Sequence, residues 1–238
     1  MATSALLPVR TLLLAALALA GLRAQEADPN GAAQRATHAP LPHLHPLDAL
    51  RHLQRGNAAL LAARRAREAA PEPAPRPSGA GRYVCAVLVC ADADADVPAL
   101  LGLRRQDVLV LAAPGPFVSP ETAALLDRVV AEERLSLIVV LGHEPCRSLA
   151  PTVRAGEPPD ALQRRAALVH AAALRSGRSP ATALVRAQCE QLRLALDRSR
   201  AALARDRLRI VPAVLDVREQ AVQFVHRPAD ELPIAPVR

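Results

Sequence analysis

Three short, almost unbroken apolar runs constrain the fold of this chain more than any other feature. They span Tyr83–Cys90, Asp107–Ala112 and Leu137–Leu141. Such runs are typical of strands that are covered on both faces, as in a parallel sheet. Between the last two lies Ser119–Arg134, which begins with a serine N-cap and a proline and therefore predicts a helix. This order predicts a strand–helix–strand unit with a right-handed crossover.

The rest of the chain adds helices around that sheet. Leu47–Arg67 has leucines at helical spacing and is predicted as a helix interrupted near Gly56 and Asn57, followed by a proline-rich linker over residues 71–79. The sequence therefore predicts an α/β fold: a central, mostly parallel β-sheet flanked by helices, with an N-terminal helical arm. The further predicted elements are an amphipathic helix at Pro159–Arg175, a long helix at Ser179–Asp206, and a strand pair at Leu208–Leu215 and Ala221–His226.

Composition excludes one class of partner. The 238 residues include one Tyr, two Phe and no Trp, too few aromatic rings for a base-stacking surface. The formal net charge is +7, and all 30 basic residues are arginines, but acidic residues are mixed in throughout. We therefore expect no nucleic-acid partner.

The N-terminus predicts export. Arg10 precedes the apolar run Thr11–Leu22, and small residues follow it. A run of 12 residues is too short to span a membrane, which takes about 20, and it is typical of a signal peptide. Cleavage is expected after Ala24, with Ala20 as the alternative site, so the protein is predicted to be periplasmic or secreted without a stable membrane anchor. The other interpretation is an N-terminal helix packed on the domain.

The predicted organisation has four parts. They are a signal peptide over residues 1–24, an arm, helix and linker over 25–79, a main domain with the sheet over 80–228, and a tail over 229–238.

Two short segments carry residues with metal chemistry. Cys90, Asp92 and Asp94 lie where the first strand ends, and His143 and Cys146 lie where the third ends. The carboxyl ends of parallel strands share one edge of a sheet, so these side chains are expected to meet. Two thiolates and an imidazole suit Zn²⁺, and three protein ligands with an open fourth position form a catalytic site. The alternative is a buried strand cysteine beside a polar loop.

The remaining cysteines and histidines predict structural roles. Cys85 and Cys189 fall at core positions of a strand and a helix, and His170 falls on an amphipathic helix. His43 and His45, with His38, lie in the proline-rich arm and indicate a solvated segment.

The two metal segments also carry a family resemblance. The pattern C-x-D at Cys90–Asp92 and the pattern G-H-x-x-C at Gly142–Cys146 resemble the signature of the β-class carbonic anhydrases, as does LIVVLGHEPC at residues 137–146. GLRRQDVLVLAAPGP at residues 102–116 is similar to the family stretch between them. The resemblance runs from about Leu47 to His226.

The resemblance implies a function and a site. It implies zinc held by Cys90, His143 and Cys146, with Asp92 either as the fourth metal ligand or displaced by the reactive water. The implied activity is reversible hydration of CO2 to bicarbonate and a proton by a zinc-bound hydroxide, with Asp92 as the catalytic residue that gates the metal or accepts a hydrogen bond from that hydroxide. The family also implies a homodimer or higher homo-oligomer, in which the N-terminal helix crosses onto the partner.

One departure from the family concerns this chemistry directly. In the family the aspartate of C-x-D-S-R is held off the metal by the following arginine, whereas here that position is Asp94. A carboxylate without its arginine is expected to fall onto the metal and close the open position. Arg147 and Arg104 are the candidates to replace the lost guanidinium. The alternative function is therefore an exported, zinc-binding, carbonic-anhydrase-like protein with a closed site and no hydratase activity.

Overall fold

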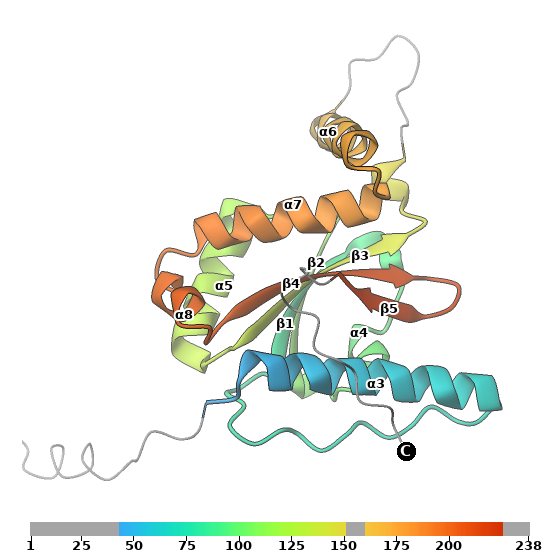
Figure 1. Ribbon diagram of the computed structural model, residues 1–238, viewed down its shortest axis with the longest axis vertical. Coiled ribbons are helices and arrows are strands. Elements are labelled where there is room, and N and C mark those ends of the chain that lie inside the picture. The colour runs from blue at the N-terminus through green and yellow to red at the C-terminus, as the bar shows by residue number, and fades with distance from the viewer. Residues whose placement is uncertain (1–42, 151–159, 226–238) are drawn as a thin grey trace, which may run out of the picture. The chain divides into compact units, whose positions relative to one another are not determined.

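The computed structural model describes residues 43–150 and 160–225 (Figure 1). The predicted signal peptide and the predicted tail lie outside the described residues. Within the described part, no helix combines the length and the apolar character that crossing a membrane requires.

The centre of the molecule is a five-stranded sheet with the order β2-β1-β3-β4-β5. The four strands β2, β1, β3 and β4 run parallel to one another, and the edge strand β5 pairs antiparallel with β4. The predicted mostly parallel α/β fold is confirmed. The strands are β1 (Cys85–Cys90), β2 (Val108–Ala113), β3 (Leu137–Glu144), β4 (Arg209–Asp216) and β5 (Ala221–Phe224).

Helices cover both faces of this sheet (Figure 1). Helices α3 (Pro46–Ala66) and α4 (Val97–Leu100) lie on one face, and α5 (Pro120–Glu133) and α7 (Pro180–Ala195) lie on the other. Helix α6 (Ala161–Ser176) packs on α7, away from the sheet.

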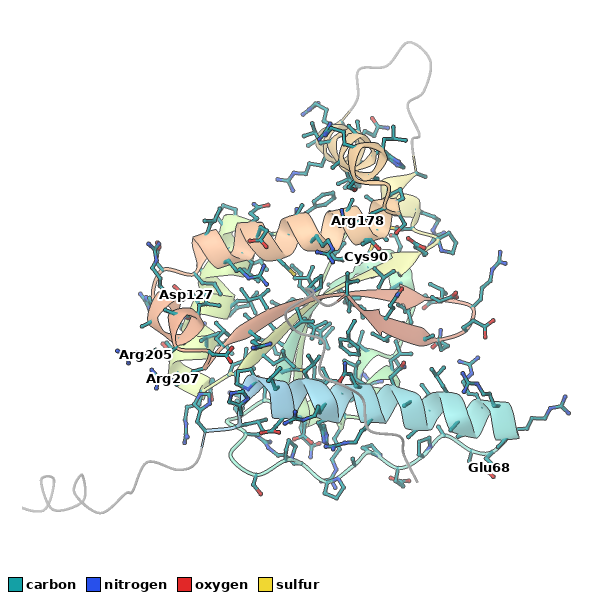
Figure 2. The ribbon with its side chains drawn as sticks, in the orientation of Figure 1. Glu68, Cys90, Asp127, Arg178, Arg205 and Arg207 are labelled. Carbon is teal, nitrogen blue, oxygen red and sulfur yellow. The ribbon has the colours of Figure 1, made fainter. Side chains whose placement is uncertain are left out.

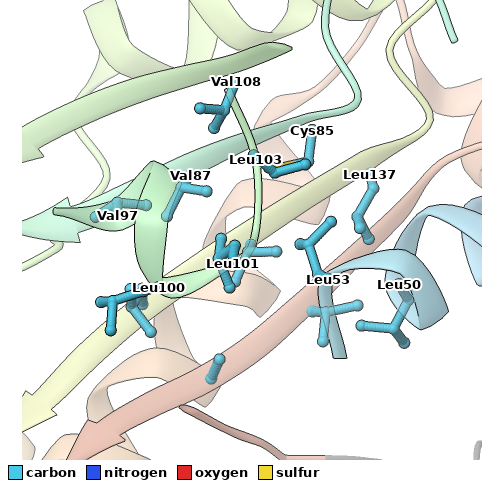
Figure 3. Packing of buried hydrophobic residues seen from close by; sticks show 14 of the residues in the cluster. Leu50, Leu53, Cys85, Val87, Val97, Leu100, Leu101, Leu103, Val108 and Leu137 are labelled. Atoms are coloured by element: carbon cyan, nitrogen blue, oxygen red, sulfur yellow. The ribbon is translucent and has the colours of Figure 1, made fainter. Parts of the chain in front are cut away.

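Alternation along the strands divides the apolar side chains between two cores. In β1, Cys85, Val87 and Val89 pack in the core under α3, with Leu50 and Leu53 (Figure 3). The intervening Ala86 and Leu88 pack in the core under α5 and α7. Both faces of the strand are therefore apolar, which explains the unbroken run in the sequence.

The predicted interruption of the first helix at Gly56 and Asn57 is wrong, because α3 runs through both residues without a break. A Cβ atom on Gly56 would lie 2.1 Å from the backbone oxygen of Leu101, so glycine is needed there for close approach of two backbones. Asn57 is buried and donates to the carbonyl oxygens of Leu100 and Gln220, at 3.0 and 3.1 Å. These contacts join α3 to two segments distant in sequence.

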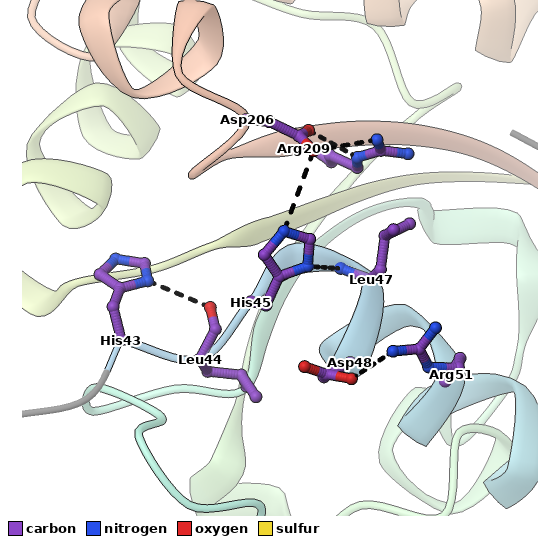
Figure 4. A network of polar contacts seen from close by, with 8 residues as sticks. All are labelled: His43, Leu44, His45, Leu47, Asp48, Arg51, Asp206 and Arg209. Carbon is purple, nitrogen blue, oxygen red and sulfur yellow. Dashed lines mark hydrogen bonds and ion pairs between the residues drawn. The ribbon is translucent and has the colours of Figure 1, made fainter. Parts of the chain in front are cut away.

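The start of α3 is fixed by a histidine that the sequence placed in a solvated segment. The Nδ1 atom of His45 accepts a hydrogen bond from the Leu47 amide at 3.3 Å and caps the helix (Figure 4). Its Nε2 atom lies 3.9 Å from the carboxylate of Asp206, which also pairs with Arg209. These contacts join the start of α3 to the segment that leads into β4.

The predicted long helix Ser179–Asp206 is wrong in its length, because α7 ends at Ala195 and a short helix, α8 (Arg200–Ala204), follows. The cause is Asp127 of α5, whose side chain is buried (Figure 2). Its carboxylate accepts hydrogen bonds from the amides of Arg198 and Ser199, both at 2.9 Å, and from the Ser199 hydroxyl at 2.6 Å. These hydrogen bonds satisfy the buried carboxyl oxygens and fix the turn between the helices.

Candidate metal centre

The site lies at the carboxyl ends of the neighbouring strands β1 and β3. Cys90 is the last residue of β1, and Asp92 lies in the short 3-10 helix Ala91–Ala93 that follows (Cys90 is labelled in Figure 2). His143 lies within β3, which continues past the apolar run to Glu144, and Cys146 precedes a second 3-10 helix, Arg147–Leu149. Because β1 and β3 are parallel neighbours, the two segments meet.

The structure brings together all four residues that the sequence singled out as metal ligands. One ligand atom from each of Cys90, Asp92, His143 and Cys146 can be chosen so that all four lie within 4.8 Å of one another. The sulfur atoms of Cys90 and Cys146 are 3.7 Å apart. Two thiolates bound tetrahedrally to zinc at about 2.3 Å each would be separated by about 3.8 Å, so this spacing fits the metal.

His143 supplies the second test of whether zinc fits. Its side chain is buried, and neither ring nitrogen meets a hydrogen-bond partner among the described residues. A buried imidazole without a partner carries a desolvation cost, which a bond to a metal would offset. The donor set and the bare imidazole therefore fit Zn²⁺.

Without a metal, the two thiols share one proton. The Cys146 thiol, the neighbouring His143 and the backbone amide of Gly115 stabilise the Cys90 thiolate, and together they lower the pKa of Cys90 well below its ordinary value despite burial. The same contact raises the pKa of Cys146, because its proton is bound between the two sulfurs and a second negative charge beside Cys90 is unfavourable.

This sharing predicts how zinc affinity depends on pH. Between pH 7 and 8 Cys90 is already a thiolate, while Cys146, whose pKa is raised, remains protonated. Zinc binding then releases about one thiol proton. The apparent Kd of zinc should therefore fall about tenfold for each unit by which the pH rises. Competition with a chromophoric chelator across this range measures it. A hundredfold change per unit would show two protonated thiols and contradict the arrangement.

Gly115 is a site residue that the sequence did not single out. Its amide lies 3.3 Å from the Cys90 sulfur and donates to it. The backbone has a φ of +65°, and an added Cβ would lie 2.5 Å from the ring of Phe117. Glycine is thus required by both the backbone conformation and the space.

Ser148 is the second residue that was missed, and it contacts Asp92. Its amide and its hydroxyl both donate to Oδ2 of Asp92, at 2.6 and 2.7 Å. Burial raises the pKa of Asp92, but these hydrogen bonds, helped by the charges of His143 and Arg147, outweigh it and lower the pKa. The only available signal was a hydroxyl two residues after the second cysteine.

Asp94 stands apart from this contact. Its side chain is exposed and its backbone has a φ of +43°, in the left-handed region. The hydrogen bonds that hold Asp92 therefore come from Ser148 rather than from the position where the family has arginine.

Two hollows in the described part of the chain are bordered by residues of the site. One, of about 610 Å³, is bordered by Cys90, Asp94, Arg105 and the exposed side of β2. The other, of about 550 Å³, is bordered by His143, Cys146, Leu149, His170 and Arg218. Small molecules can therefore approach the cluster.

Known proteins resemble this chain in fold rather than in sequence. No protein-family model matches the sequence, and no match to a curated protein was found. The fold is similar to the C39A mutant of the β-carbonic anhydrase CafD of Aspergillus fumigatus, with a TM-score of 0.53 and 19% identity over 70% of this chain and 96% of that one. It is also similar to a tetrameric β-carbonic anhydrase from Sordaria macrospora, with a TM-score of 0.51 and 19% identity over 62% of this chain and 82% of that one. The described chain therefore has the β-carbonic anhydrase fold.

Proposed function

We propose that this protein is a zinc-dependent carbonic anhydrase that interconverts CO2 and bicarbonate. The observation that carries the proposal is the cluster of Cys90, His143 and Cys146, with an imidazole whose nitrogens have no hydrogen-bond partner among the described residues and with sulfur atoms at zinc spacing. These three residues would hold the metal. When bound, zinc would supply a nucleophile at neutral pH by lowering the pKa of a water molecule towards ~7.

The protein's own residues would tune and orient that chemistry. The amide of Gly115 holds the Cys90 sulfur in its ionised form, ready to act as a ligand. The pKa of Asp92 is lowered from a value that already lies well below neutral, so its side chain is an ionised carboxylate at neutral pH. Since Oδ2 of Asp92 takes both donors of Ser148, Oδ1 would accept the hydrogen bond that orients the attacking water.

The experiment that tests the proposal combines metal analysis with stopped-flow CO2 hydration. The purified protein should contain about one zinc per chain and should hydrate CO2 faster than buffer alone. Removal of zinc with a chelator should abolish this rate, and added zinc should restore it. A zinc-replete protein with no hydration activity would overturn the proposal.

A closed, inactive zinc site is the second candidate. It is supported by the position of Asp92 within ligand range of the other three residues and by Asp94 at the arginine position. In this case Asp92 would be the fourth ligand.

Substitution of Asp94 discriminates the two candidates. Because Ser148 already supplies two hydrogen bonds to Asp92, we expect Asp94→Arg to change the CO2 hydration rate by less than about twofold. In a closed site the new guanidinium would instead draw Asp92 away, and the rate would rise about tenfold or more. Stopped-flow rates of CO2 hydration by the wild type and by Asp94→Arg across pH measure this difference. A large rise would favour the closed site.

The proposal includes export and assembly. Residues 1–24 would direct export and be cleaved near Ala24, which N-terminal sequencing of the mature protein tests. The chain would form a homodimer or a higher oligomer, in line with the tetrameric Sordaria macrospora enzymes. Light scattering on the purified protein measures its mass, and a monomer at micromolar concentration would contradict this part.

A further inference from the structure

Among the residues that the structure describes, Ser148 donates both hydrogen bonds that the Asp92 carboxylate accepts. Both donors on Oδ2, the amide and the hydroxyl at 2.6 and 2.7 Å, belong to Ser148. Short hydrogen bonds to an ionised carboxylate are among the stronger ones in proteins. To move onto a metal, Asp92 would have to weaken or give up these contacts.

The donors are fixed before any metal binds, because the turn that carries Ser148 is anchored in the fold. The next residue, Leu149, is buried in the core that α6 and α7 form. Nε2 of His170, on α6, donates to the carbonyl oxygen of Leu149 at 2.6 Å. The amides of Leu149 and Ala150 close the turn on the carbonyls of Cys146 and Arg147. A donor held this rigidly costs little to form its hydrogen bond.

The Ser148 hydroxyl donates its proton to Oδ2 of Asp92. It lies 2.7 Å from Oδ2 of Asp92 and 3.8 Å from the sulfur of Cys90. The shorter contact to a charged oxygen decides the direction, so the proton points to Asp92.

We propose that Ser148 is a positioning residue that holds Asp92 away from the metal and keeps the fourth coordination position open. It does with two uncharged donors what the family arginine, replaced here by Asp94, does with a guanidinium. The inference rests on the proposed function, because it assigns a role within the same zinc site.

Access of a small anion to the metal tests it without measuring activity. In the cobalt-substituted protein, azide should bind the open position and change the visible absorption of Co²⁺. Ser148→Ala removes one of two hydrogen bonds to Asp92, so the carboxylate should compete with azide and raise its apparent Kd about tenfold. Ser148→Thr keeps the hydroxyl and should restore the wild-type Kd to within about threefold.

A double-mutant comparison shows whether Ser148 acts through Asp92. In an Asp92→Ala background no carboxylate can reach the metal, so adding Ser148→Ala should leave the azide Kd unchanged. An equal weakening in that background would overturn the inference, as would a Ser148→Ala protein with wild-type azide affinity.

The remaining outcomes separate this inference from the proposed function. A wild-type cobalt protein that does not bind azide has a closed site, which overturns the role of Ser148. The expected azide pattern together with zinc-loaded protein that does not hydrate CO2 supports Ser148 and rejects the hydratase. A protein that binds no cobalt overturns both.

Discussion

Replacing Cys146 by serine should weaken zinc binding by at least about 100-fold and reduce CO2 hydration to the buffer rate. Structural zinc sites bind with apparent free energies of about 10–16 kcal/mol over four ligands, so one ligand contributes about 3 kcal/mol. A serine hydroxyl keeps the size of the side chain but is not ionised near neutral pH, so it does not replace a thiolate. The Kd of zinc by competition with a chelator, and zinc content after dialysis, measure the effect.

A thiol outside the cluster gives the matched control. Cys189 is buried in the core under α7, and it is a free thiol outside the four-residue cluster. Cys189→Ala should therefore keep about one zinc per chain, although it loses some packing. Full zinc occupancy in a Cys90→Ser, Cys146→Ser double variant would contradict the metal centre.

The sheet and the meeting of the site residues could be predicted because both follow from rules that act locally or by topology. Unbroken apolar runs identify strands covered on two faces, and parallel strands bring their carboxyl ends to one edge. Cys90 and His143 therefore met as expected, 53 positions apart in the chain.

The contacts that were missed depend on tertiary structure. Ser148 contacts Asp92 only because Leu149 and His170 fix the turn after Cys146, and no local pattern specifies such an anchor. In the same way, the end of α7 is set by Asp127, which lies 68 positions before Ala195. A single sequence contains the residues of these contacts but not the pairing between them.

Gly56 misled the helix prediction for a related reason. A glycine inside a helical pattern usually weakens the helix, and an asparagine next to it strengthens the impression of a break. In the fold, Gly56 is helical because the backbone at Leu101 and Gly102 approaches it. A tertiary contact therefore explains a glycine at a position where local preference alone predicted a break in the helix.

That contact gives the second large effect, in the stability of the fold. Gly56→Ala would place a Cβ atom 2.1 Å from the Leu101 oxygen and 2.9 Å from the Cα atom of Gly102, and backbone on both sides cannot move aside cheaply. Relief would require α3 to withdraw, which would strain the hydrogen bonds of Asn57 to Leu100 and to the β4–β5 turn. We expect the free energy of unfolding to fall by about 3 kcal/mol, even though alanine is the better helix former.

Chemical denaturation of wild type and variants measures this loss, and another glycine isolates its cause. Gly177 has a φ of +63°, but a Cβ there would meet nothing within 4 Å. Gly177→Ala therefore carries backbone strain without a clash and should cost only about 1 kcal/mol. If Gly56→Ala costs no more than Gly177→Ala, α3 does not approach the Leu101 segment as closely as the structure has it. A large cost at Gly56 alone would mean that this approach holds α3 against the loop that leads from Asp92 to β2.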